Sequence, residues 1–190
     1  MGSIRESIQH SIAVKQAILE DAEMIKKIEQ VVDICVKSLR AGGKIHFCGN
    51  GGSAADAQHL AAELSGRFYF NRPPLNAEAL HCNTSYLTAV ANDFGYVHIF
   101  SRLLEGTGKA GDVVIGISTS GNSDNIVEAF RKAREMGVAT VAMTGEAGGL
   151  MRMADVLLNV PSKDTPRIQE SHIMIGHIIC ELIEKEIFNS

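Results

Sequence analysis

Two side chains able to bind a metal or transfer protons, His59 and Glu63, lie four positions apart in the sequence. In a helix that spacing places both on one face, about one turn apart, where they can share a ligand. An imidazole and a carboxylate together suit a divalent metal or acid-base chemistry, although such pairs are also common on solvated helices. The pair is therefore a candidate site whose role depends on its neighbours.

A second cluster of polar residues lies at the start of an otherwise apolar segment near the C-terminus. It consists of Gln169, Glu170, His172 and His177. Gln169 and His177 are eight residues apart, about 12 Å along a straight helix, so they cannot bind one ion side by side. Either Gln169 precedes the helix, or long side chains converge, or the two come from different subunits. For Glu170 and His172 we favour a place on the surface of the helix over a direct role.

Residues 48–56 read Cys-Gly-Asn-Gly-Gly-Ser-Ala-Ala-Asp and form a glycine-rich loop around Asn50, Gly51 and Gly52. Glycines permit a tight turn and expose backbone N–H groups, which stabilise an anion at the start of a helix. The loop lacks the third glycine of a dinucleotide fingerprint, and no acidic residue ends the next strand, so NAD is disfavoured. A turn that serves only helix packing is the alternative.

Residues 118–123 read Ser-Thr-Ser-Gly-Asn-Ser and place four hydroxyls, those of Ser118, Thr119, Ser120 and Ser123, within six residues. Hydroxyls and helix-terminal N–H groups can surround a phosphate monoester without magnesium or a P-loop lysine. A simple helix cap explains one hydroxyl but hardly four. The loop therefore predicts a phosphate site.

The elements that must position these groups follow from the hydrophobic periodicity. Helical spacing is found at residues 3–18, opened by a capping box at Ser3 and Glu6, and at residues 21–41. Short apolar strands are predicted at residues 44–48, 77–82, 113–118, 139–144 and 156–160. Helical segments separate most of them, at residues 54–65, 85–104, 123–136 and 149–153, and a long helix covers residues 167–188.

This alternation predicts an α/β fold with three layers, in which a central parallel sheet of about five strands is flanked by helices. We expect one domain over residues 1–190, made of an N-terminal helical segment, 1–41, and an α/β core, 42–190. In a parallel sheet the ligand lies beyond the carboxyl ends of the strands, where both polar loops fall.

The composition also disfavours nucleic-acid-binding and membrane-spanning proteins. The net charge of -4 provides no basic stripe for nucleic acid, and no apolar run is long enough to span a bilayer. The four cysteines are scattered, which favours reduced thiols, and no signal peptide is evident, so a cytoplasmic location is expected.

Taken together, five segments closely resemble the phosphoheptose isomerases of the sugar isomerase (SIS) fold. They are residues 48–59, 62–67, 92–95, 116–123 and 167–172, in order along nearly the whole chain. The resemblance implies a homotetramer, with N-terminal helices for oligomerisation and active sites at subunit interfaces. It also implies conversion of sedoheptulose 7-phosphate into D-glycero-D-manno-heptose 7-phosphate, the first step of bacterial heptose synthesis for lipopolysaccharide or other surface glycans.

Carried over by position, the resemblance implies three sets of site residues. The substrate-binding residues are Asn50, Gly51, Gly52, Glu63, Asn92, Asp93, Ser118, Thr119, Ser120, Ser123 and Gln169. The zinc ligands are His59, Glu63, Gln169 and His177. Glu63 and His177 also match the proposed base and acid, and these roles compete because a zinc-bound carboxylate is a weaker base.

The favoured mechanism is proton transfer through an enediol, with Glu63 as base and His177 as proton shuttle. One rival is the non-catalytic DnaA initiator-associating protein of the same fold, which lacks residues matching Glu63 and His177 and carries Thr at the position of Gly52. A second rival is an SIS enzyme or sensing domain for a hexose or pentose phosphate. Residues 68–84 depart from familiar relatives, so no substrate contact is assigned there.

Overall fold

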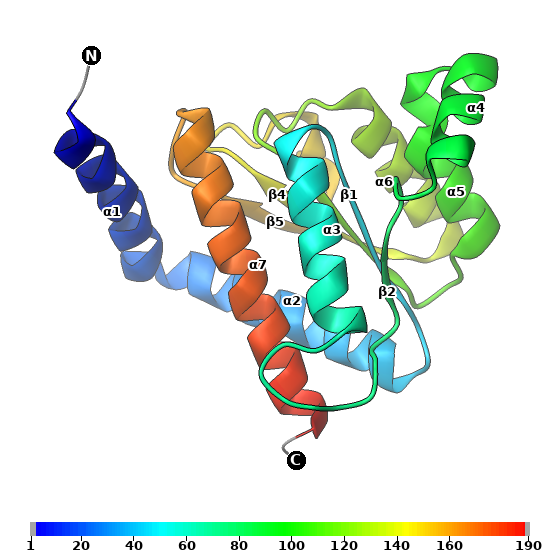
Figure 1. Ribbon diagram of the computed structural model, residues 1–190, viewed down its shortest axis with the longest axis horizontal. Helices are drawn as coiled ribbons and strands as arrows, with labels where there is room; N and C mark the ends of the chain where they lie inside the picture. Colours follow the sequence, from blue (N-terminus) through cyan, green and yellow to red (C-terminus); the bar gives the residue numbers. More distant parts are fainter. Residues whose placement is uncertain (1–2, 189–190) are drawn as a thin grey trace.

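The computed structural model describes residues 3–188. Its centre is a five-stranded, wholly parallel sheet in the order β2-β1-β3-β4-β5, with helices on both faces (Figure 1). The predicted α/β fold with a parallel sheet of about five strands is therefore confirmed. The strands are β1 (Ile45–Gly49), β2 (Ala77–Ala79), β3 (Val113–Ser118), β4 (Ala139–Thr144) and β5 (Val156–Asn159).

The helices divide into two layers. The helices are α1 (Ile4–Glu20), α2 (Ala22–Arg40), α3 (Gly52–Ser65), α4 (Thr84–Phe94), α5 (Ile99–Thr107), α6 (Asp124–Met136) and α7 (Thr165–Phe188), with short 3-10 turns η1 (Tyr96–His98) and η2 (Gly149–Met153). One buried apolar cluster joins the sheet to α2, α3 and α7, and a second joins it to α5 and α6. The sheet thus has a buried core on each face, as crossover helices require.

The first two helices begin as their sequences predict. Ser3 accepts the N–H of Glu6 and donates its own N–H to the Glu6 carboxylate, which completes the capping box. Asp21 ends α1 and caps α2 by accepting the N–H groups of Glu23 and Met24. Ser3 therefore fixes the start of α1, and Asp21 fixes the point at which the chain passes from α1 to α2.

Strand β2 is shorter than expected. It pairs with β1 only over Ala77–Ala79, although residues 77–82 were predicted as strand. Leu80 still donates its N–H to the carbonyl of Phe47, but the chain then turns toward Asn83, the cap of α4. The strand ends early because the chain must turn after Leu80 for Asn83 to cap α4.

Helices α3 and α7 lie side by side and run in the same direction (Figure 1). The N-terminal Gly52 of α3 lies against Gln169 near the start of α7, and Leu60 lies against Gly176 two turns further on. A Cβ atom at residue 176 would lie 2.5 Å from the Leu60 side chain, so the helices approach as closely as they do because residue 176 is glycine.

The extent of α7 removes one of the three alternatives left open for Gln169, and its packing corrects the expectation for His172. The helix begins at Thr165, so Gln169 lies inside it and does not precede it. His172 is fully buried, contrary to the surface position favoured for it, because its ring reaches the Thr144 carbonyl at the end of β4. Glu170 is partly exposed, as expected.

All four cysteines are free in the structure, as their scattered positions predicted. Cys35, Cys48 and Cys180 are buried, and burial raises the pKa of the Cys35 and Cys48 thiols to about 12. Cys82 is exposed. Within residues 3–188, none of the helices is both long and apolar enough to cross a lipid bilayer.

Candidate active site

The glycine-rich loop follows β1 and is held by a small amide network. Asn50 and Asn125 exchange two side-chain hydrogen bonds of 3.0 and 2.9 Å, and the Tyr96 hydroxyl donates to Asn50 Oδ1 at 3.1 Å. Gly51 has a φ of 57°, a conformation that other residues rarely adopt. A hollow of about 330 Å³ opens here, lined by Asn50, Tyr96, Val97, Ser123, Asp124 and Asn125.

The hydroxyl loop follows β3, the strand next to β1, so both predicted loops lie at the same edge of the sheet. Ser118 and Ser123 share a hydrogen bond of 2.8 Å across the turn, and Ser120 accepts the N–H of Asn122 at 3.2 Å. Ser123 is the N-cap of α6, but its side chain makes no capping bond. A second hollow of about 250 Å³ touches Thr119 and Ser120 on the side of β4. The hydroxyls are therefore not explained by helix capping alone.

Gln169 belongs with the glycine-rich loop. A Cβ atom placed on Gly52 would lie 2.6 Å from Gln169 Nε2, so the amide of Gln169 crosses the start of α3 in space that only glycine leaves open. Gln169 precedes His177 by eight residues of the same helix, about 12 Å of rise. One chain therefore does not bring Gln169 to the side of His177.

Asn92 and Asp93 lie at the end of α4, and both are exposed. Asn92 donates to the carboxylate of Asp93 at 2.8 Å, so their side chains contact each other. The nearest link from this region to the glycine-rich loop is the Tyr96 hydroxyl, three residues further on.

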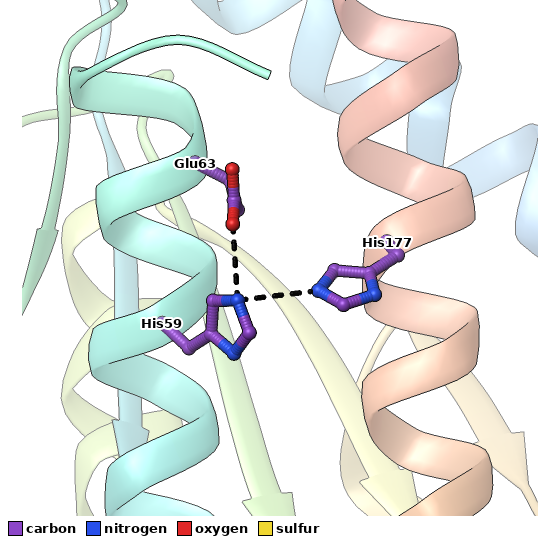
Figure 2. A group of neighbouring side chains, drawn as sticks. All are labelled: His59, Glu63 and His177. Carbon is purple, nitrogen blue, oxygen red and sulfur yellow. Dashed lines mark hydrogen bonds and ion pairs between the residues drawn. The ribbon is translucent and has the colours of Figure 1, made fainter. Parts of the chain in front are cut away.

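The third group is formed by two helices. His59 and Glu63 project from α3, and His177 projects toward them from α7 (Figure 2). His59 Nε2 lies 3.0 Å from Glu63 Oε1 and 3.4 Å from His177 Nε2, and the three potential ligand atoms lie within 4.8 Å of one another. The helical spacing of His59 and Glu63 predicted that they share a face, and the structure adds His177.

The donor set of these three residues fits a divalent metal. A neutral imidazole nitrogen carries at most one proton, so His59 Nε2 cannot act as donor to both Glu63 and His177. If instead His59 Nε2 accepts a hydrogen bond from His177, it carries no proton and offers no donor to the Glu63 carboxylate. A cation between two imidazole nitrogens and one carboxylate oxygen would satisfy all three atoms, and this is a common catalytic zinc donor set with a fourth position left open.

Asp56 adds acidic character one turn before His59. Its side chain is half-buried, and this burial raises the pKa of its carboxyl, an effect that the neighbouring His59 and His177 partly offset. A negative potential from Asp56 favours a cation at the nearby histidines.

Buried His172 predicts a pH dependence of stability. Burial lowers the pKa of His172 from 6.5 to about 4, while its bond to the Thr144 carbonyl opposes that change. Between these values the unfolded chain binds a proton that the folded chain does not, so the free energy of unfolding falls as the pH drops from 6.5 to 4. The expected loss is on the order of 3 kcal/mol.

Denaturant unfolding at several pH values checks this expectation, with His172→Gln as the comparison. The variant should show a shallower fall in the free energy of unfolding over that pH range. A fall of the same steepness in both proteins would assign the dependence to other groups, such as His46, whose pKa burial also lowers.

Some residues of this region carried no signal in the sequence. Asn125 and Tyr96 hold Asn50, and the Phe68 ring lies 5.7 Å from the His177 ring. Asn125 is buried in the first turn of α6, a position that only the structure reveals. Phe68 lies in the segment left without assigned contacts.

Comparison with known proteins places these features in a family. Residues 9–145 match the model of the SIS domain. A phosphoheptose isomerase of Sulfurimonas denitrificans is 59% identical over 97% of this chain and 95% of its own length. Another, from Aneurinibacillus thermoaerophilus, is 55% identical over 98% and 95%.

Solved structures agree with the sequence relatives. The phosphoheptose isomerase from Neisseria gonorrhoeae superposes with a TM-score of 0.89 at 44% identity, covering 96% of this chain and 97% of that one. The enzyme from Francisella tularensis gives 0.91 at 35% identity, covering 96% of each chain.

Proposed function

The chain belongs to the phosphoheptose isomerases of the SIS domain family, and from this we propose that it converts sedoheptulose 7-phosphate into D-glycero-D-manno-heptose 7-phosphate. The activity is that of an aldose-ketose isomerase in heptose biosynthesis, which supplies lipopolysaccharide or other surface glycans. The observation that carries the proposal is the convergence of His59, Glu63 and His177 from α3 and α7, two helices whose N-termini lie at the same end of the sheet as the hydroxyl loop. We expect the enzyme to act in the cytoplasm.

The hydroxyl loop and the glycine-rich loop suit different parts of a sugar phosphate. We assign the phosphate to Ser118, Thr119, Ser120 and Ser123, because hydroxyls and helix-terminal N–H groups stabilise an anion without a full positive charge. The sugar hydroxyls are assigned to Asn50, Gly51, Gly52, Asn92, Asp93 and Gln169, whose amide, carboxylate and backbone groups can donate and accept hydrogen bonds.

In the proposed reaction, Glu63 removes the proton from the carbon next to the carbonyl and returns it to the neighbouring carbon. His177 moves protons to and from the sugar oxygens. The two side chains project toward each other between α3 and α7, so they can face the same two carbons (Figure 2).

His59, Glu63 and His177 would hold zinc, and zinc would polarise the substrate carbonyl. Because a group bound to zinc is a weaker base, metal binding and proton transfer compete at Glu63 and His177. Gln169 was also matched to a zinc ligand, and its place beside Gly52 means that it joins this ion only if a second subunit supplies it or α7 shifts. We therefore assign Gln169 to the substrate in its own subunit.

The mechanism is tested by isomerisation in heavy water. A proton transfer through an enediol exchanges with solvent, so deuterium should appear at the carbon that receives the proton. Complete retention of the substrate hydrogen would indicate a hydride shift instead. A panel of pentose, hexose and heptose ketose phosphates in the same assay separates this function from that of other SIS enzymes.

The non-catalytic alternative is disfavoured by Gly52. A threonine at this position, as in the initiator-associating protein, would place its Cβ atom against the Gln169 amide, 2.6 Å from Nε2. The present chain keeps the space that lets Gln169 reach the glycine-rich loop. Glu63 and His177 are also both present and adjacent.

We propose a homotetramer in which the apolar face of α1 packs on a second copy of the chain. Ile4, Ile8, Ile12 and Leu19 are exposed along this helix, between 54% and 83%. Ile4, Ile8 and Ile12 line a hollow of about 360 Å³ between α1 and the start of α7, and Leu19 lines a second hollow of about 380 Å³ between α1, α2 and α7. Isolated apolar side chains on a surface are ordinary, but a row at helical spacing is typical of a helix that packs on a partner.

Replacing Ile12 with Asp should therefore lower the mass of the assembly in analytical ultracentrifugation, because the carboxylate would be buried without a partner. Gln9→Asp, which places the same charge at an exposed position of α1, is the control and should leave the mass unchanged. A tetramer that survives Ile12→Asp would place the interface elsewhere.

A further inference from the structure

A buried ion pair lies at the C-terminal end of the α3–α7 pair, and neither of its residues belongs to the candidate active site. Arg72 and Glu184 join through Nε and Oε1 at 2.7 Å, and their side chains are only 2% and 0% exposed. A fully buried charged pair destabilises a protein unless its polar atoms are satisfied by hydrogen bonds.

Glu184 binds the backbone of the loop that connects α3 to β2. Its two oxygens accept the backbone N–H groups of Phe68, Tyr69 and Phe70, at 3.1, 2.6 and 3.1 Å. Burial alone would raise the pKa of Glu184, but the bonds from these N–H groups and from Arg72 outweigh it and lower the pKa. The carboxylate is therefore held in its charged form as the centre of a backbone cradle.

Arg72 fastens the same loop to the end of α3. Its Nη2 donates to the carbonyl of Glu63 at 2.9 Å, and its Nη1 donates to the carbonyls of Leu64, Gly66 and Pro73 at 2.7, 3.1 and 3.1 Å. Carbonyls in the last turn of a helix have no partner within the helix, and a guanidinium satisfies them. Glu63 thus receives a direct main-chain contact from the pair.

The pair also reaches His177 by two routes. Glu184 lies seven residues after His177 in α7, two turns along the same face of the helix. Phe68, whose N–H is bound by Glu184, places its ring 5.7 Å from the His177 ring. The loop crosses from the end of α3 to α7 and back to β2 (Figure 1).

We propose that Arg72 and Glu184 are positioning residues that hold Glu63 and His177 at the spacing needed for ligand binding and proton transfer. The pair clamps the C-terminal turn of α3 to α7 through the loop of residues 66–76, and neither side chain touches the ligand atoms itself. This inference deepens the proposed function and rests on it for the roles of Glu63 and His177.

The test replaces Glu184 with Gln, which keeps the shape but removes the charge and presents an amide to backbone N–H groups. The matched control is Asp112→Asn, because Asp112 is also a buried carboxylate that accepts two backbone N–H groups, from Lys44 and Lys109, and binds a histidine, His46. Asp112 precedes β3, at the opposite edge of the sheet from the two polar loops. Each variant loses a comparable buried network at a different place.

The first readout does not depend on activity or on metal. In the metal-free protein labelled at histidine, the ring resonances of His177 should shift or broaden in Glu184→Gln and stay in place in Asp112→Asn, whereas His46 should show the reverse. Assignment comes from His177→Asn and His46→Gln. Unchanged His177 resonances in folded Glu184→Gln would overturn the inference.

Arg72→Lys is the second variant, and near-UV circular dichroism reports whether each protein is folded. Lysine keeps a positive charge beside Glu184 but cannot reach the carbonyls of Glu63, Leu64 and Gly66 together. It should disturb the His177 resonances in the same way. If Glu184→Gln fails to fold, Arg72→Lys decides, and wild-type His177 resonances in it would reject the inference.

Two further readouts separate positioning from general destabilisation. The affinity for Co²⁺, followed by its absorption spectrum, should fall about 10- to 100-fold in Glu184→Gln and remain unchanged in Asp112→Asn. With sedoheptulose 7-phosphate, kcat should fall while KM stays near the wild-type value, since the phosphate loop is untouched. A wild-type protein without turnover would reject the proposed function, whereas the histidine resonances would still decide on the clamp.

Discussion

Replacing Glu63 with glutamine is expected to lower kcat for sedoheptulose 7-phosphate by about 100- to 10,000-fold, the usual contribution of a general base. Glutamine keeps the length of the side chain, its place on α3 and its contact distance to His59, but it cannot take up the proton. KM should change much less, because the loops assigned to the substrate are elsewhere. A coupled assay of product formation measures both constants.

The matched control is Glu181→Gln. Glu181 is a half-buried carboxylate on α7 that pairs with Lys185, one turn after His177, and it has no place in the proposed mechanism. Both enzymes should be assayed after chelation and after zinc addition, with bound zinc measured directly. Full turnover by metal-replete Glu63→Gln would remove Glu63 from the role of base.

Replacing Gly121 with alanine should destabilise the protein by about 2 to 5 kcal/mol, from a strained backbone and a steric overlap together. Gly121 has a φ of 68°, and a Cβ atom there would overlap the backbone carbonyl of Gly148. That contact joins the hydroxyl loop to the turn after β4, where Met151 donates its N–H to the Gly121 carbonyl at 2.9 Å. Denaturant unfolding measures the loss.

Gly106→Ala is the control for this substitution. Gly106 lies in α5 with no atom within 4 Å of the added Cβ, so alanine should stabilise the helix by about 0.5 to 1 kcal/mol. If Gly121→Ala remains folded, its KM should also rise, because Ser120 and Ser123 flank the displaced residue. Equal stability of the two variants would mean that the loop relaxes freely and is not fixed by Gly148.

Much of this architecture follows from local signals in the sequence. The capping box at Ser3, the apolar run of β3 and the alternation of strands and helices predict the order of the elements, because each depends on residues close together in the chain. The shared face of His59 and Glu63 follows from helical geometry in the same way. The position of both polar loops at one edge follows from the parallel sheet.

The remaining features depend on packing between distant segments. His172 belongs to a polar stretch that suggests a surface, and only the end of β4 supplies the carbonyl that makes its burial possible. The approach of His177 to His59 depends on the register of α7 against α3, which no local pattern encodes. Glu184 lies in the last turns of α7 and is buried because the backbone of residues 68–70 folds over it.

The close approach of α3 and α7 at Gly176 has a consequence for metal selectivity. His59 and Glu63 belong to one helix and His177 to the other, so the helix separation sets the distance between their ligand atoms. A side chain at residue 176 would push against Leu60 and increase that distance. A metal held by these three residues would therefore be a first-row transition ion with short bonds to nitrogen and oxygen, and not calcium, which requires longer bonds and more oxygen ligands.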